Sequence, residues 1–309
     1  QVDLSLFPLS ANDQLTIQRG GNSALWGSGA IGGSILLENR PQWERHQYLH
    51  TQLELGQFGH YYGGANLSLG KERFHSNSKL FYRQTENNFY YLPRGSEIKQ
   101  RQIHSASQQW GGIQDLYWKL NERQQLSYHA WYQQSDREIP RSAQQYDQSF
   151  RQNLQWKYVG DRSYWKVNVA HLRDQLAYTD SVASIFSDNR NLATIIEPEF
   201  NLQWKSFKGQ IGLNLSQYEV RGGSLEQERL QQTRSAIFSS LQYQTDRLQI
   251  SGSLRQAWTD QLRIPLMPDL GLTWKILPNA QFRARVNRSF RQPTFNDLYW
   301  NPGGNPELL

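Results

Sequence analysis

The feature that most constrains this chain is an alternation of apolar and polar residues, which begins near His46 and continues through most of the sequence. Leu248, Ile250 and Leu254, for example, alternate with glutamine, serine and arginine residues. A period of two is the pattern of a β-strand whose two faces meet different environments. Because the pattern recurs strand after strand, the sequence predicts an all-β fold built on one large antiparallel sheet.

Strands of this kind recur about thirteen times, and most of them are about ten residues long. The predicted strands span 47–56, 60–70, 77–86, 107–118, 124–134, 150–159, 163–174, 198–205, 209–219, 232–244, 247–258, 268–276 and 280–290. Strands of water-soluble proteins usually have about five or six residues, whereas a tilted strand that crosses a bilayer needs about nine to eleven. The lengths therefore favour strands that cross a membrane.

The connections between these strands alternate in length once the first hairpin is passed. The short connections are 71–76, 119–123, 160–162, 206–208, 245–246 and 277–279. The long connections are 87–106, 135–149, 175–197, 220–231, 259–267 and the segment after 291. Short turns in the periplasm and long loops outside the cell are typical of outer-membrane proteins, so the sequence predicts a transmembrane antiparallel β-barrel. Arg283, Arg285 and Lys205 should face a wet lumen, because a lipid-facing arginine at the bilayer centre costs about 2–4 kcal/mol.

The composition argues against several other classes of protein. No stretch approaches the roughly 18 consecutive apolar residues of a transmembrane helix, and a chain without cysteine forms no disulfides. The net charge of +6 is scattered along the chain, so nucleic acid is not an expected partner. Aromatic residues make up 13% of the chain and mostly lie near predicted strand ends, as in the girdles of membrane barrels. The alternative is a soluble or surface-attached β-rich binding module, such as a propeller or an adhesin, whose rings form cross-strand pairs.

Motifs for catalysis or metal binding are not found in the sequence. The seven histidines do not have the spacing of a zinc site. The chain also lacks a nucleophile elbow and a phosphate-binding loop followed by lysine and serine or threonine. We therefore expect neither a metal, nor a cofactor, nor an enzymatic activity.

The first 43 residues break the alternation and are rich in glycine. They predict two short strands, 14–19 and 33–38, joined by a glycine-rich turn that contains a helical turn at Ser23–Trp26. Three glycines between 27 and 32 formally match the dinucleotide-binding pattern, but the amphipathic helix that such a site needs does not follow them. We expect the glycines to allow positive φ and close backbone packing instead.

Three segments resemble the family of TonB-dependent outer-membrane receptors. Ile17–Ile35 is similar to the signature at the end of the family's plug domain, and Ser289–Trp300 with Gly304–Leu308 is similar to a conserved barrel segment. Ser135–Arg141 resembles the siderophore and cobalamin branch. The residues of the plug motif are Arg19, Gly20, Gly21, Gly27, Gly29, Gly32 and Gly33.

The resemblance implies a receptor that binds a scarce solute and imports it to the periplasm. The expected solute is a ferric siderophore or cobalamin, and an oligosaccharide is the open alternative. Its partners would be the TonB complex, which pulls on the plug, and the lipid of the Gram-negative outer membrane. Residues 1–43 would form the C-terminal part of the plug domain, and residues 44–309 the N-terminal part of the barrel. Barrels of this family have about 22 strands, so the chain is expected to be a fragment of a longer molecule.

Candidate ligand-binding residues lie in loop 87–97, where Phe89, Tyr90 and Tyr91 stand near Arg94. Three rings and one cation suit a chelate or a planar ligand, because aromatic faces supply contact area and arginine supplies charge. The alternative is that these rings pack onto neighbouring loops.

Two further arginines are candidates, Arg137 for ligand binding and Arg19 for seating the plug. Arg137 belongs to the charged cluster 136–141, whose simplest explanation is a solvated loop tip. Arg19 would be costly to bury without a partner, and the resemblance implies that it faces the barrel wall and pairs with a carboxylate. Glu54, Asp115 and other carboxylates are all open as that partner.

Overall fold

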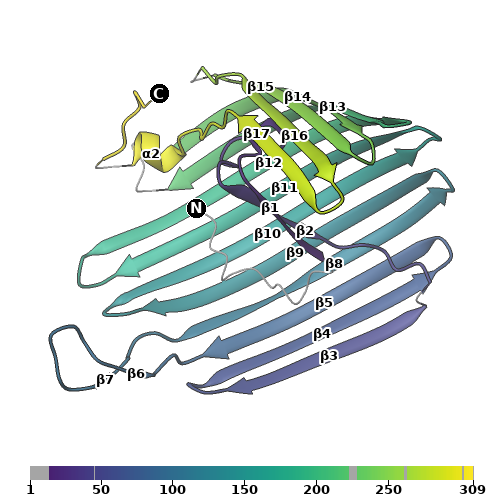
Figure 1. Ribbon diagram of the computed structural model, residues 1–309. Helices are drawn as coiled ribbons and strands as arrows, with labels where there is room; N and C mark the ends of the chain where they lie inside the picture. The colour runs from purple at the N-terminus through teal and green to yellow at the C-terminus, as the bar shows by residue number, and fades with distance from the viewer. Residues whose placement is uncertain (1–13, 45, 223–227, 261–262, 301–302, 309) are drawn as a thin grey trace.

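The computed structural model describes residues 14–44, 46–222, 228–260, 263–300 and 303–308. One antiparallel sheet of 13 strands dominates it, in the order β17-β16-β15-β14-β13-β12-β11-β10-β9-β8-β5-β4-β3 (Figure 1). The strands are β3 (Gln47–Gly56), β4 (His60–Lys71), β5 (Phe74–Thr85), β8 (Ser107–Asn121), β9 (Gln124–Ile139), β10 (Ala143–Val159), β11 (Ser163–Asp180), β12 (Ile185–Trp204), β13 (Phe207–Gly222), β14 (Arg229–Gln244), β15 (Leu248–Thr259), β16 (Met267–Leu277) and β17 (Ala280–Asn287). The all-β fold predicted from the alternation is confirmed.

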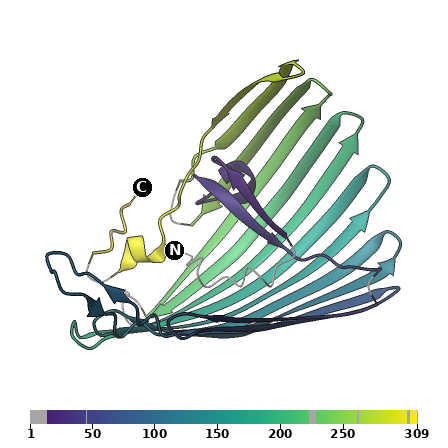
Figure 2. The ribbon, with the colours of Figure 1, turned by 60° about the horizontal axis from the view of Figure 1, so that its bottom comes forward.

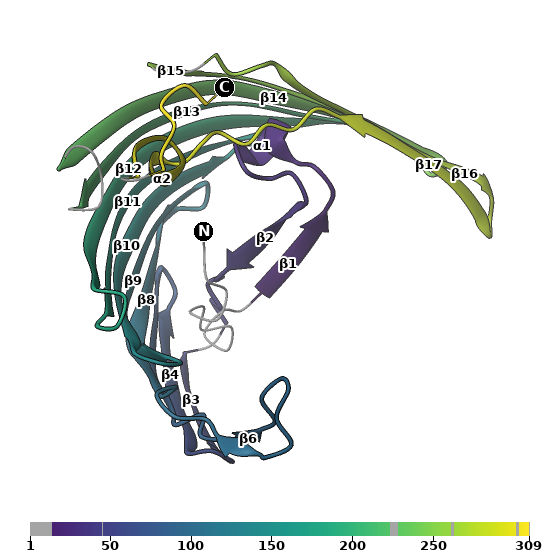
Figure 3. The same cartoon turned by 90° about the vertical axis from the view of Figure 1, so that its left-hand side faces the viewer.

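The large sheet is strongly curved, and its two ends do not meet (Figure 3). β3 and β17 are its edge strands, and within the described residues each has a single neighbour. The predicted barrel is therefore present as an open, curved wall.

The structure corrects two of the predicted long loops. Segments 135–149 and 175–197 are mostly strand, because only residues 140–142 separate β9 from β10 and only residues 181–184 separate β11 from β12. Backbone pairing continues through these extensions although they are rich in polar residues. Hydrophobic alternation marks only the part of a strand that has one apolar face, so it made these strands appear too short.

The two ends of the wall can be told apart by their connections. Consecutive strands are joined at one end by residues 72–73, 122–123, 160–162, 205–206, 245–247 and 278–279. We call this the turn end, and the opposite end, which carries the strand extensions and loop 86–106, the loop end.

The two faces of the wall are the reverse of those in a water-soluble protein. On the convex face apolar side chains are exposed, as for Leu53 (85%) and Leu270 (61%). On the concave face polar side chains are buried, among them Asp115 (1%), His75 and Lys79. Water-soluble proteins bury apolar side chains and rarely expose large apolar surfaces. The convex face is therefore suited to a nonpolar medium, and the concave face to a polar interior.

Aromatic side chains gather on the convex face at the turn end. Ring centroids lie 5.2, 4.7 and 4.8 Å apart in the cross-strand pairs Phe74–Trp118, Trp165–Phe200 and Phe207–Tyr243. A further pair, Trp110–Tyr132 at 5.5 Å, lies nearer the loop end. Amphipathic rings at the two edges of an apolar band form the interfacial girdles of membrane barrels.

A second, two-stranded sheet lies on the concave side of the wall (Figures 2 and 3). It pairs β1 (Gln14–Arg19) with β2 (Gly33–Glu38), and α1 (Ser23–Trp26) lies in the turn between them. These bounds confirm the two short strands and the helical turn predicted from the sequence. We call residues 14–38 the inner hairpin.

The remaining elements are short. β6 (Tyr90–Tyr91) and β7 (Gln100–Arg101) form a small sheet within loop 86–106, and α2 (Phe295–Tyr299) follows β17. Neither of the helices in the described part of the chain is long and apolar enough to cross a membrane.

Candidate functional site

Glycines shape the turn of the inner hairpin. Gly20, Gly27, Gly29 and Gly33 have φ angles of +89°, +82°, +93° and +153°, a region that side chains disfavour. At Gly33 a Cβ atom would also stand 2.4 Å from the backbone oxygen of Gln18. The expected positive φ is thus present at these four positions.

Gly21 and Gly32, the other glycines of the motif, do not have positive φ. A Cβ atom at Gly21 would lie 2.4 Å from the Asn287 Oδ1 atom and 2.5 Å from the Ser289 Oγ atom. The lack of a side chain at Gly21 therefore allows the hairpin to lie close to the end of β17. A Cβ atom at Gly32 would meet nothing within 4 Å, and the structure gives no reason for a glycine there.

One arginine of the wall binds the hairpin turn directly. Arg285 of β17 donates from Nη2 to the backbone oxygen of Gly21 at 2.9 Å and to Oδ1 of Asn22 at 2.6 Å. Its guanidinium is also ion-paired with Asp269 of β16, and the distance from Nε to Oδ1 is 2.9 Å. Asp269 thereby orients the fork of Arg285 toward the hairpin. The prediction that Arg285 faces the interior is confirmed.

A second wall arginine contacts the hairpin at Leu25, in α1. Arg255 of β15 donates from Nη1 to the backbone oxygen of Leu25 at 3.3 Å. Its guanidinium lies 5.3 Å from the ring centroid of Phe238, within the range of a cation–π contact. A Cβ atom at Gly27 would stand 3.3 Å from its Nη2 atom. Arg255 is therefore held between an aromatic ring and the hairpin backbone.

The segment after β17 also binds the hairpin turn. The Gly29 N–H donates to the backbone oxygen of Phe290 at 3.2 Å, and the Gln292 N–H donates to Oγ of Ser28 at 2.7 Å. The buried side chain of Gln292 donates to Gln232 of β14 at 3.1 Å. Gln292 thus links the hairpin turn to the wall.

Residues 288–292, which we call the clasp, lead into α2 at the loop end. Thr294 and Asp297 form a capping box at its start. Phe295 and Tyr299 pack against a small buried cluster of Val220 and Leu230, at the loop ends of β13 and β14. The chain therefore joins the loop end of the wall to the hairpin turn within a few residues.

The segment between the hairpin and β3 is attached to a different part of the wall. Asn39 Nδ2 donates to Oδ2 of Asp115 at 2.8 Å, and Nδ1 of His129 lies 2.7 Å from the other oxygen of that carboxylate. The ring of Trp43 lies edge-on to the Tyr117 ring, with the centroids 6.5 Å apart. Nζ of Lys119 is 4.5 Å from the Trp43 ring centroid. The inner hairpin is therefore tied to the wall at two separate places.

The structure differs from the expectation for Arg19. Its side chain is exposed at the end of β1, and no ion pair of Arg19 is found within the described ranges. Of the carboxylates considered, Asp115 is bound by Asn39 and His129, and Glu54 lies 3.7 Å from Nε2 of His60. The cations at the contact between hairpin and wall come from the wall, which reverses the expected direction of the interaction.

Loop 86–106 brings together only some of the predicted ligand-binding residues. The Phe89 ring lies 6.0 Å from the Phe58 ring and 6.5 Å from the Tyr91 ring, and both pairs are edge-on. Tyr90 is 69% exposed, and its backbone pairs with Arg101. Arg94 is exposed in the same loop. The aromatic cluster of Phe58, Phe89 and Tyr91 thus includes one ring that the sequence did not single out.

Arg137 lies apart from this cluster. It is half-buried on β9 and ion-paired with Asp147 of β10, with an Nη2–Oδ2 distance of 3.1 Å. The simplest sequence explanation, a solvated loop tip, is wrong because residues 136–139 are paired strand. The role of Arg137 in the structure is to join two strand extensions.

Three residues that hold the hairpin or orient its contacts were not singled out from the sequence: Arg255, Asp269 and Gln292. The alternation places Arg255 and Asp269 on the polar face, and this signal predicts a partner in the interior without naming it. Gln292 carries no such signal, because its contacts with Ser28 and Gln232 join segments that are far apart in the chain.

A carboxylate at the loop end has a strongly perturbed pKa. Glu219, near the end of β13, accepts hydrogen bonds from Gln231, Arg229 and Arg221, which lower its pKa to about 2. Arg229 and Gln231 belong to β14, so their hydrogen bonds to Glu219 link β13 to β14 beside the α2 cluster. Among the described residues, no group of three or more histidine, aspartate or glutamate side chains is arranged to hold a metal ion.

Comparison with known proteins identifies relatives of the chain. Residues 107–308 match a family model described as TonB dependent receptor-like, beta-barrel. The chain is 22% identical over 325 residues to the vitamin B12 transporter BtuB of Photobacterium profundum, a match that covers 99% of this chain and 51% of that protein.

Solved structures share the fold. The copper transporter OprC has a TM-score of 0.80 at 16% identity, covering 96% of this chain and 53% of its own. A mutant of the ferric enterobactin receptor PfeA from Pseudomonas aeruginosa has a TM-score of 0.76 at 13% identity, covering 96% of this chain and 51% of its own. The chain thus spans about half the length of the relatives it matches.

Proposed function

Because the chain belongs to the family of TonB-dependent receptors, we propose that it is part of an outer-membrane receptor that imports a scarce solute in a TonB-dependent manner. The solute is a ferric siderophore or cobalamin. In this proposal residues 1–43 are the C-terminal part of the plug domain, and residues 44–309 are the N-terminal part of the barrel. The turn end of the wall faces the periplasm, and the loop end faces the outside of the cell.

One observation carries the proposal: a polar concave wall, with an apolar convex face, holds a glycine-rich hairpin inside its curve. The apolar face with its aromatic bands suits a bilayer. The hairpin is held by hydrogen bonds from Arg285 and Arg255 to backbone oxygens. Polar attachments of this kind can be exchanged for water, which suits an element that has to move during transport.

The loop end supplies candidate ligand contacts. The aromatic cluster of Phe58, Phe89 and Tyr91, together with the exposed Arg94, offers ring faces and a positive charge to a chelate. The relatives' names, a vitamin B12 transporter and a ferric enterobactin receptor, support the two solute classes that we propose.

The first test measures the full-length protein in washed outer membranes of cells grown with iron or with an iron chelator. We expect the protein in this fraction, and a rise under chelation supports a ferric siderophore as solute. No change directs the binding assays to cobalamin. Absence from the outer-membrane fraction contradicts the proposal and favours a soluble binding module.

The second test addresses the ligand contacts. We expect the Phe89→Ala/Tyr91→Ala variant of the full-length protein to bind its ferric chelate or cobalamin at least about tenfold more weakly, since two rings at a binding site each contribute about 1 kcal/mol or more. Phe186→Ala removes an exposed ring at the loop end of β12 and serves as the control. Equal binding by both variants would remove the aromatic cluster from the site.

A further inference from the structure

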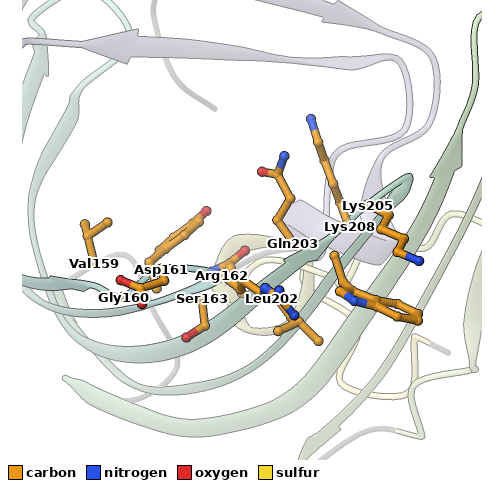
Figure 4. A pocket seen from close by; sticks show the side chains of 13 residues that line it. Val159, Gly160, Asp161, Arg162, Ser163, Leu202, Gln203, Lys205 and Lys208 are labelled. Atoms are coloured by element: carbon orange, nitrogen blue, oxygen red, sulfur yellow. The ribbon is translucent and has the colours of Figure 1, made fainter.

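A cavity of about 600 Å³ lies at the turn end of the wall, away from the inner hairpin. It is a notch between two neighbouring turns, residues 160–162 between β10 and β11 and residues 205–206 between β12 and β13. Figure 4 shows that Leu202 and Ser163 point to one side of the sheet, and that Gln203 and Lys208 point to the other. The notch is therefore open to both the convex and the concave face at the rim.

The convex side of the notch is apolar. Leu202 and Trp204 are exposed there, and the Trp204 ring stacks beside that of Phe207, with the centroids 6.4 Å apart. Gly209 is the cross-strand partner of Leu202 and has no side chain to fill the space above it. The nearest atom to a Cβ placed at Gly209 is Cδ1 of Leu241 at 4.0 Å. A shallow apolar groove thus runs over Gly209, between leucines on the two flanking strands.

The rim side of the notch is cationic. Arg162 and Lys205 are exposed, and neither forms an ion pair within the part of the chain that the structure describes. Asp161, the acidic residue of the notch, is 3.2 Å from Nη2 of Arg123 on the preceding turn. Its charge is therefore balanced by a residue outside the notch, which leaves Arg162 and Lys205 available to an anion.

The backbone conformation at Lys205 is unusual for a lysine. Its φ is +50°, in a connection of two residues, where glycine or asparagine is the ordinary choice. A lysine at this position is strained relative to those residues. The ammonium that it places at the rim is also 5.3 Å from the Trp204 ring centroid. This contact directs the charge toward the apolar groove and not into the lumen, so the sequence prediction for Lys205 is wrong.

We propose that this notch binds a glycerophospholipid with an anionic headgroup. Arg162 and Lys205 hold the phosphate, and an acyl chain lies in the groove over Gly209. The cations and the apolar groove adjoin one another, so the shape and charge of the notch fit an amphiphile better than a free anion. This inference rests on the proposed function, since it requires the convex face to lie in a bilayer with the turn end at a phospholipid leaflet.

The test is native mass spectrometry of the full-length protein in neutral detergent, titrated with dioleoyl phosphatidylglycerol or dioleoyl phosphatidylcholine. We expect the anionic lipid to bind more tightly than the zwitterionic lipid. The variant Arg162→Gln/Lys205→Asn removes both charges, and asparagine tolerates the positive φ of the turn. We expect it to bind phosphatidylglycerol about 25-fold more weakly, from about fivefold for each lost cation near a lipid surface.

Two further variants and one competitor sharpen the test. Lys71→Gln/Arg73→Gln removes one lysine and one arginine at another turn and should change the affinity less than about twofold, since the proposed site lies elsewhere. Gly209→Leu fills the groove and should weaken phosphatidylglycerol binding without altering the charge. Inorganic phosphate should not displace the lipid at millimolar concentration; displacement would instead indicate a simple anion site and overturn the proposal.

The result that overturns the inference outright is equal phosphatidylglycerol binding by the wild type and the Arg162→Gln/Lys205→Asn variant. This failure is distinct from failure of the proposed function. If the protein is in the outer membrane and binds its solute, but the variant binds phosphatidylglycerol as tightly as the wild type, only the lipid site is contradicted. A protein that is absent from the outer membrane contradicts the function itself.

Discussion

Replacing Arg285 with glutamine should weaken the attachment of the inner hairpin's turn to the wall. The substitution removes two hydrogen bonds from a charged donor, to the Gly21 oxygen at 2.9 Å and to the Asn22 Oδ1 atom at 2.6 Å. Hydrogen bonds of charged groups contribute about 1.5–3 kcal/mol each. The Arg285 side chain is 39% exposed, so solvent screening reduces the combined loss below the sum of two such bonds, to about 2–3 kcal/mol.

Hydrogen exchange of the backbone amides reports this loss directly. The Asn22 N–H donates to the Ala30 oxygen at 2.8 Å, and the Gly27 N–H donates to the Ser23 oxygen at 3.0 Å, so both amides exchange only when the turn opens. A loss of about 2–3 kcal/mol in the free energy of local opening speeds exchange by about 30- to 150-fold. The measurement uses the full-length protein in detergent, with Arg285→Gln compared with the wild type.

Two controls separate the hairpin contact from other effects of the substitution. Arg283→Gln removes a charge two residues away on the same face of β17 and should leave exchange of these amides within about twofold of the wild type, because Arg283 makes no contact with the hairpin that the structure records. Arg285→Gln/Asp269→Asn also removes the carboxylate that the single variant leaves unpaired. If exchange of Asn22 and Gly27 is unchanged in Arg285→Gln, or rises equally in Arg283→Gln, the assignment of Arg285 as the anchor is refuted.

Three further predictions concern the same region and its neighbours. Gly33→Ala should destabilise the inner hairpin by about 1–3 kcal/mol, because φ is +153° and the new Cβ meets the Gln18 oxygen. Faster limited proteolysis between residues 20 and 33 would measure this loss. In the control Gly32→Ala the new Cβ meets nothing within 4 Å, so this variant should behave as the wild type. Ser28→Ala removes the acceptor of the Gln292 N–H and should destabilise the clasp by about 1 kcal/mol, seen as faster exchange of Gln292 with little change at Asn22. Hydrogen bonds lower the pKa of Glu219 to about 2 from 4.5. The contribution of the Glu219 carboxylate to stability is therefore complete above about pH 4.5 and is lost as the pH falls through 2. An NMR titration of this carboxyl group with a midpoint near 4 contradicts the prediction.

The sequence predicted the wall well because its signal is local and repeated. The bounds of β3, β1 and β2 match the predicted ranges, since alternation or the glycine pattern covers each of them completely. β12 was predicted at 198–205 but spans Ile185–Trp204. Its first half has polar residues on both faces, and backbone pairing, which depends on the neighbouring strand, has no signature in the residues themselves.

The candidate site could be predicted only where one residue determines the outcome. Positive φ at Gly27 and Gly29 follows from the lack of a side chain, and the interior position of Arg285 follows from the cost of a charge on an apolar face. Arg19 was expected to pair with the wall because the family resemblance implied that it faces the wall, where an unpaired arginine would be costly to bury. In the structure the hairpin supplies backbone oxygens and the wall supplies cations. Because every residue has a backbone oxygen, no residue type in the sequence identifies these acceptors.

The way the inner hairpin is attached determines how it can be released. A force applied to the chain ahead of Gln14 acts first on the open end of the β1–β2 ladder, where Gln14 pairs with Glu38. The two strands are antiparallel and end in the turn, so the six pairs from Gln14–Glu38 to Arg19–Gly33 are broken one after another. Breaking bonds in sequence needs less force at any moment than breaking them together, and the contacts of Arg285 and Arg255 lie beyond the last pair. The strands of the hairpin can therefore separate while the turn stays on the wall. The contacts of the turn with Arg285, Arg255 and residues 290–292 then decide whether the turn follows.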